Sequence, residues 1–110
     1  MAAVLIFGGS PLLAQPALVE RPDTPAVSER TYMPPAGYVP DAETAIKIAV
    51  AVWEPIYGRQ QIRRNKPFRA TLRGGVWMVR GSLPSGAVGG VAEADISMRD
   101  GRVLRVIHSR

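Results

Sequence analysis

Glu93, Asp95 and His108 are the residues of this chain whose types and spacing could support general acid–base chemistry. The two carboxylates stand two positions apart, which places them on one face of a β-strand. A hairpin turn at Asp100-Gly101 would set His108 opposite Glu93. A carboxylate beside a histidine can transfer protons, but the same pair is more often a weak surface ion pair. We interpret the three as surface residues and expect no catalytic site.

Basic side chains gather in the middle of the chain, where no acidic residue lies between Glu54 and Glu93. The whole chain holds 14 Lys and Arg against nine Asp and Glu, for a net charge of +5. Such a cluster favours an acidic partner surface, mainly through faster and more selective association; the alternative is a solvated basic face. The residues that we expect to bind a partner are Arg63, Arg64, Lys66, Arg69, Arg73 and Arg80.

Composition excludes several other kinds of site. The chain has no cysteine and a single histidine, His108, which excludes disulfide frameworks, thiol nucleophiles and sites built from several histidines. We expect no metal and no cofactor. An arginine cluster near Trp77 would suit nucleic acid, but Trp77 is expected in the core and export would separate the protein from nucleic acid. We therefore expect a protein partner and no nucleic acid.

The N-terminal residues are typical of an export signal. Residues 2–7 form a short apolar run, and Ala14 offers a small residue for cleavage. No Lys or Arg precedes the run, although export signals usually begin with one, so we expect that the start of the signal is truncated. The run is too short and too interrupted to span a bilayer. We expect residues 1–14 to be a signal peptide and the mature protein to be periplasmic, without an integral membrane segment.

Residues 15–39 are rich in proline and lack a hydrophobic period, which predicts a disordered linker without a packed core. The folded domain is expected over residues 40–110. Asp41 is a suitable N-cap for a helix that Pro55 and Gly58 end, with one short further turn within residues 59–65. The polar positions of this helix form one narrow stripe: Glu43, Lys47 and Glu54. The rest of its surface is so apolar that a curved sheet should wrap it.

Two predicted β-hairpins follow the helix. A Gly74-Gly75 turn would place Leu72 opposite Trp77 on an apolar side and Arg69 opposite Arg80 on a basic side. Two arginines directly opposite each other repel unless solvent or an anion relieves them. The Asp100-Gly101 turn would place Met98 opposite Val103, Ile96 opposite Arg105 and Ala94 opposite Ile107, with Arg105 as a misfit on the core side. The sum is an α+β domain: one main helix packed on a mainly antiparallel four-stranded sheet.

Five segments of this domain are informative when they are taken together. They are residues 40–58, 66–72, 76–84, 89–96 and 101–108, within which the Thr44-Ala-Ile, Pro55-Ile-Tyr-Gly and Gly81-Ser-Leu-Pro motifs are the most specific. Residues 38–110 resemble a bacterial family of immunity proteins with a fold like that of nuclear transport factor 2. The chain departs from the family pattern in its basic stretch at residues 63–66 and in its proline-rich leader.

The resemblance implies a small fold of the nuclear transport factor 2 or cystatin type. It also implies a non-enzymatic protein that neutralises a cognate polymorphic toxin by direct binding, with no catalytic residues to transfer. One alternative is a small ligand-binding or acid–base enzyme domain of the same fold that uses Glu93, Asp95 and His108. Another is an envelope inhibitor or accessory module of the PepSY type, because the same order of elements would serve it.

Overall fold

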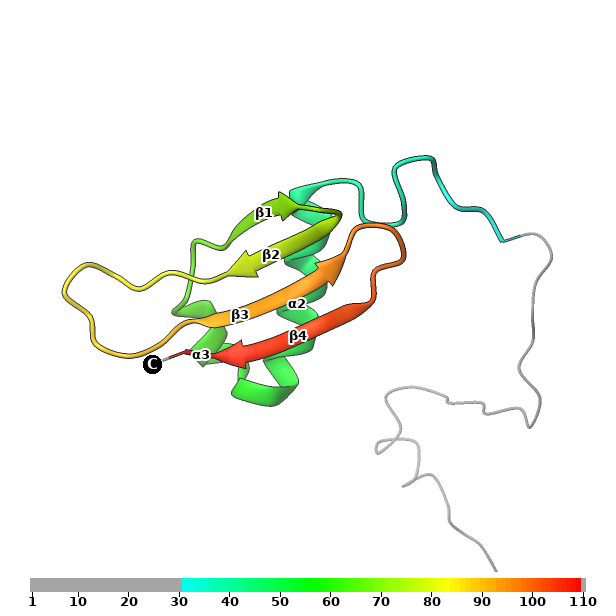
Figure 1. Cartoon of the computed structure of the whole chain (residues 1–110). Coiled ribbons are helices and arrows are strands. Elements are labelled where there is room, and N and C mark those ends of the chain that lie inside the picture. The colour runs from blue at the N-terminus through cyan, green and yellow to red at the C-terminus, as the bar shows by residue number, and fades with distance from the viewer. Residues whose placement is uncertain (1–30, 110) are drawn as a thin grey trace, which may run out of the picture. The chain divides into compact units, whose positions relative to one another are not determined.

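A computed structural model describes residues 31–109, so the expected signal peptide and most of the expected linker lie outside the described residues. The helices are α2 (Ala42–Tyr57) and α3 (Arg59–Arg63), and the strands are β1 (Arg69–Arg73), β2 (Val76–Arg80), β3 (Ala92–Ser97) and β4 (Val103–His108). The four strands form one antiparallel sheet in the order β1-β2-β3-β4, and α2 crosses one face of it (Figure 1). The predicted α+β architecture is confirmed.

Helix α2 begins where the sequence predicts. Asp41 has extended backbone angles, and its Oδ1 accepts a hydrogen bond of 2.7 Å from the backbone N–H of Thr44. This bond satisfies one of the N–H groups that have no partner inside the first turn. The helix continues through Pro55 and ends at Tyr57, because Gly58 adopts a φ of 96°. Of the two expected stops, only Gly58 ends the helix.

We predict that Asp41→Ala lowers the melting temperature at neutral pH by an amount that shrinks in acid. Hydrogen bonding by the Thr44 side chain and backbone holds the pKa of Asp41 below its ordinary value of 3.8. A carboxylate with a lowered folded-state pKa stabilises the fold above its unfolded pKa, and this contribution is lost as the pH falls through the lowered value. Melting curves by circular dichroism at neutral pH and below pH 3.8 measure both differences.

Asp41→Asn is the matched control for this prediction, because asparagine caps helices about as well as aspartate but does not titrate. It should retain most of the wild-type stability at neutral pH and lose the acid-dependent part. A melting-temperature difference between wild type and Asp41→Ala that stays constant across the pH range would contradict the role of the ionised cap.

The core lies between α2 and the sheet. Its largest fully buried side chains include Trp53, Ile62, Ile96 and Val39. Val39 precedes the predicted domain boundary at Pro40, yet its backbone N–H donates to Met98 O at 2.9 Å and its carbonyl accepts from Trp77 Nε1 at 2.8 Å. The packed part of the chain therefore begins upstream of Pro40.

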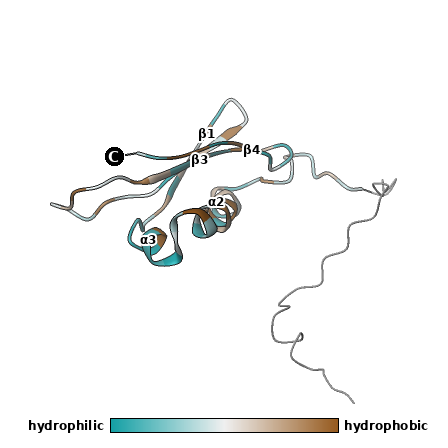
Figure 2. Cartoon of the chain, turned by 90° about the horizontal axis from the view of Figure 1, so that it is seen from below, coloured by the Kyte–Doolittle hydropathy of each residue, from teal (hydrophilic) through white to brown (hydrophobic). Residues whose placement is uncertain are grey.

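The sheet covers α2 on one side only. Figure 2 shows both helices in one layer beneath the sheet. Within α2 only Ala45, Ala49 and Trp53 are buried, while Ala51 and Ile56 are exposed. The expectation that the sheet wraps most of this apolar helix is wrong for the described residues, because the four strands lie on one side of α2 and bury one stripe of it. Apolar surface of α2 therefore remains uncovered within the described residues.

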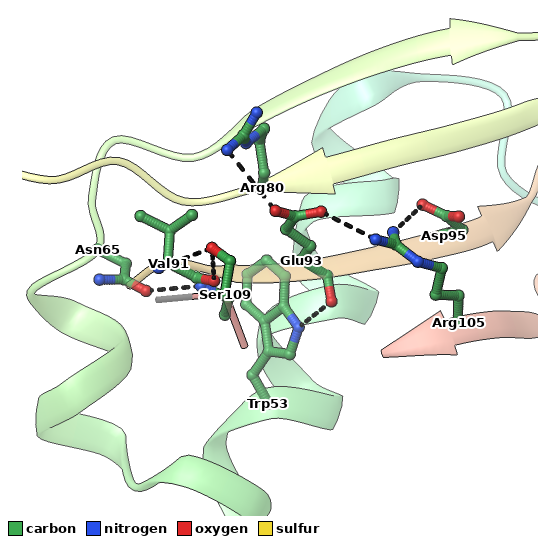
Figure 3. A network of polar contacts seen from close by, with 9 residues as sticks. Trp53, Asn65, Arg80, Val91, Glu93, Asp95, Arg105 and Ser109 are labelled. Atoms are coloured by element: carbon green, nitrogen blue, oxygen red, sulfur yellow. Dashed lines mark hydrogen bonds and ion pairs between the residues drawn. The ribbon is translucent and has the colours of Figure 1, made fainter. Parts of the chain in front are cut away.

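Asn65 joins the end of α3 to the sheet. It is fully buried, and its Oδ1 accepts from the backbone N–H of Ala92 at 3.0 Å (Figure 3). Its carbonyl accepts from the N–H of Ser82 at 2.6 Å. These bonds hold the connection between α3 and β1 against the ends of β2 and β3. The basic residues on either side of Asn65 are thereby tied to this edge of the sheet.

The first hairpin has the predicted register. Arg69 pairs with Arg80, Ala70 with Val79, and Leu72 with Trp77. Gly74 and Gly75 have φ angles of 57° and 77°, the left-handed conformation that two-residue hairpin turns require and that glycine adopts without strain. The turn chemistry alone is therefore enough to set which side chains face the helix.

The second hairpin does not have the predicted register. Ile96 pairs with Val103 and Asp95 with Arg105, and a bulge falls between them. The backbones of Met98 and Arg99 bond instead to Val39, Tyr38 and Gly75, so these two residues are withdrawn from pairing with β4. The connection is therefore longer than a two-residue turn at Asp100-Gly101. The bulge then moves the residues of β4 beyond it to the face opposite the predicted one.

Candidate partner-binding surface

The face of the sheet that points away from α2 carries most of the charged strand residues, and we call it the open sheet face. Pairing across the strands arranges it in rows. One row runs Arg69, Arg80, Glu93 and Ile107; the next runs Thr71, Met78, Asp95 and Arg105; the third runs Arg73, Val76 and Ser97. Strand alternation places these residues together, since their neighbours along each strand face α2.

Ion pairs neutralise the half of the open sheet face that lies over β3 and β4. Glu93 accepts from Arg105 at 3.2 Å and lies 3.6 Å from Arg80, and Asp95 lies 3.5 Å from Arg105 (Figure 3). The backbone carbonyl of Glu93 in turn accepts from Trp53 Nε1 at 3.2 Å, which ties this strand to α2. Two carboxylates and two guanidinium groups therefore balance one another.

Arg69 and Arg73 form the unbalanced half of the open sheet face. Both are exposed on β1, and neither has an ion pair within residues 31–109. The predicted repulsion between Arg69 and Arg80 is relieved by Glu93, which draws the Arg80 guanidinium toward β3. An excess of positive charge therefore remains over β1.

A shallow hollow lies between these arginines. It measures about 340 Å³ and is lined by Arg69, Thr71, Arg73, Met78 and Arg80. Met78 is its apolar lining residue and is 39% exposed, so the hollow combines an accessible apolar side chain with three arginines. Apolar contact with surrounding charge is what a protein interface needs for both affinity and selectivity.

His108 does not join Glu93 and Asp95. It pairs with Ala92 and so lies on the face toward α2, where its ring is 5.0 Å from that of Tyr57. The predicted pair of Glu93 with His108 is therefore wrong, and the physical reason is the bulge in the second hairpin. The carboxylates instead contact Arg80 and Arg105, so neither of them lies beside the imidazole that an acid–base pair would need.

The six basic residues predicted to bind a partner lie in three places. Arg69, Arg73 and Arg80 share the open sheet face. Arg63 and Lys66 border a groove on the helix side of the sheet, and Arg64 lies beside the connection between β2 and β3. The six do not form one surface, although the partner-binding role of each stays a prediction.

Arg105 is a member of the open sheet face that the sequence prediction misplaced. The predicted register put it among core residues, where an unpaired guanidinium is costly. That misfit was the available signal: moving β4 by one residue brings Arg105 opposite Asp95, where it is paired. A charged residue at a position predicted to be buried can thus indicate that a strand register is wrong.

Within the described part of the chain, no group of three or more His, Cys, Asp or Glu side chains could hold a metal ion. No helix of residues 31–109 has the length and apolar character needed to cross a membrane.

Comparison with protein families gives a match over the whole sheet and almost all of α2. A family model described as an NTF2 fold immunity protein, named for nuclear transport factor 2, matches residues 44–110. The chain belongs to this family. Comparisons with curated proteins and with solved structures gave no match. The immunity family assignment confirms the resemblance drawn from the sequence and favours an immunity-type role over a PepSY-type module.

Proposed function

We propose that this immunity domain neutralises a cognate toxin by binding it without catalysis, through the basic half of the open sheet face. The observation that carries the proposal is the pair of exposed arginines, Arg69 and Arg73, which have no ion pair within residues 31–109. They flank the exposed apolar side chain of Met78. Membership of the immunity family supports a toxin as the partner.

The charge of this surface indicates the kind of toxin surface that it fits. An inhibitor that imitates nucleic acid presents acidic groups to a nuclease, whereas the hollow on the open sheet face presents arginines. Guanidinium groups form paired hydrogen bonds with carboxylates. The complementary toxin surface is therefore an acidic patch around an apolar contact.

The geometry also supports a non-enzymatic role. An acid–base mechanism needs a proton donor and acceptor within hydrogen-bond reach of one substrate. His108 lies on the opposite face of the sheet from Glu93, and the Glu93 carboxylate contacts Arg80 and Arg105. The alternative based on these residues therefore loses the arrangement on which it depended.

The proposal is tested by expressing the chain together with candidate toxins chosen from the genes that neighbour its own. We expect the chain to protect cells from the toxin and to form a stoichiometric complex with the purified toxin domain, measured by light scattering after size exclusion. Association should slow as salt is added, because the steering charges are exposed. Protection by a chain that modifies the toxin without staying bound would contradict the proposal.

A further inference from the structure

The uncovered side of α2 forms a groove with α3 and the start of β1. The groove measures about 440 Å³, and its floor consists of the apolar side chains of Ile46, Val50, Ala51, Ile62 and Phe68. The Phe68 ring lies 5.7 Å from the buried ring of Trp53, so the floor is continuous with the core. The groove is on the helix side of the sheet and is distinct from the open sheet face.

Cationic side chains border this groove: Lys47, Arg59, Arg63 and Lys66. Lys47 is paired with Glu43 at 3.4 Å, and Arg59 is paired with Glu54 at 3.8 Å. Arg63 and Lys66 are exposed and have no ion pair within residues 31–109. The border therefore keeps an excess of positive charge beside an apolar floor.

We propose that this groove binds an acidic amphipathic helix of a partner protein. Apolar side chains on one face of such a helix would cover the exposed Ala51 and the half-buried Val50 and Phe68. Its flanking carboxylates would pair with Arg63 and Lys66. Charge complementarity selects this partner, because a second copy of the same basic surface would place like charges against each other. The binding site goes beyond the proposed function, since it uses no residue of the open sheet face.

Fluorescence anisotropy with two labelled synthetic helices tests the groove on the full chain. One peptide is built from leucine and glutamate with leucine at the i, i+3, i+4 spacing, and the other carries lysine in place of each glutamate. We expect the chain to bind the glutamate peptide and not the lysine peptide. Arg63→Glu combined with Lys66→Glu should weaken binding by about tenfold, because two exposed ion pairs are lost. Equal binding of both peptides would overturn the proposal.

Ala51→Lys separates groove binding from general attraction of opposite charges. Because Ala51 is exposed on α2, the variant should fold. The lysine side chain should fill the floor of the groove and add positive charge there. Docking in the groove predicts weaker binding of the glutamate peptide, whereas simple electrostatic attraction predicts stronger binding and would overturn the proposal. Arg99→Glu combined with Arg102→Glu, in the turn after β3, is the matched charge control for the Arg63→Glu and Lys66→Glu double variant. It should change binding of the glutamate peptide little.

Sedimentation velocity of the wild-type chain and of Ala51→Lys tests whether a second copy of the chain occupies the groove. A wild-type chain that self-associates and becomes monomeric on Ala51→Lys would show that a second copy occupies the groove, contrary to the proposal. A monomeric wild-type chain that binds the glutamate peptide supports it. Because no toxin enters these assays, a negative result here leaves the proposed neutralisation by the open sheet face unaffected.

Discussion

Trp53→Ala should lower the free energy of unfolding by about 3–5 kcal/mol, the range for large-to-small changes of a buried aromatic residue. Trp53 is fully buried and is the largest such side chain of the described residues. Its ring packs 5.7 Å from that of Phe68, and its Nε1 donates to the carbonyl of Glu93. Because domains of this size are stable by about 5–10 kcal/mol, urea denaturation should show a variant that retains little of the wild-type stability.

Trp53→Phe is the matched variant for this prediction. It retains an aromatic ring but removes the hydrogen bond to Glu93, so we expect a loss smaller than that of Trp53→Ala, about 1–3 kcal/mol. If both variants lose the same free energy of unfolding, the hydrogen bond rather than the buried volume is the main contribution. Either result bears on the open sheet face, because Trp53 anchors the strand that carries the Glu93 carboxylate.

Arg69→Glu combined with Arg73→Glu should weaken binding of the cognate toxin by about a hundredfold. The physical reason is that neither guanidinium has an ion pair within residues 31–109, so each is available to pair with a toxin carboxylate. Reversal replaces two attractions by two repulsions. Stopped-flow or surface-based kinetics should show much of the change as slower association at low salt.

Two further variants make this prediction specific. Arg80→Gln should weaken toxin binding much less, because Glu93 already holds the Arg80 guanidinium at 3.6 Å. Arg99→Glu combined with Arg102→Glu changes the net charge as much as the Arg69 and Arg73 pair does, but outside the open sheet face. Equal weakening by both double variants would assign the effect to net charge, and unchanged affinity for the Arg69 and Arg73 pair would remove this face from toxin binding.

Local chemistry was predictable from the sequence, whereas the register of the second hairpin was not. Asp41 and Gly74-Gly75 act on residues next to them, so the helix start and the first hairpin register were predictable from local chemistry. The second hairpin was mispredicted because Met98 and Arg99 bond to Tyr38 and Val39, about sixty positions away in the chain. Hydrogen bonds to such distant backbone partners cannot be inferred from the residue pattern around the turn.

Part of the candidate site was likewise predictable from the sequence, and part was not. The run of basic residues without an intervening acid is visible in the sequence, and so is the alternation that gathers Arg69 and Arg73 on one face. The sequence does not show that Glu93 neutralises Arg80 across the sheet, or that Arg105 pairs with both carboxylates. Cross-strand pairing decides which of the arginines stay available.

By itself, the sequence determined the α+β class, the helix cap and the first hairpin, because each rests on residue type and short spacing. The immunity family was indicated by resemblance to known members, which the family comparison confirmed. Only the tertiary structure decided where His108 lies, which arginines are paired, and that the sheet leaves part of α2 uncovered. These depend on which distant segments meet. A bulge of one residue turns side chains to the other face, and the four strands lie on one side of α2 and bury one stripe of it.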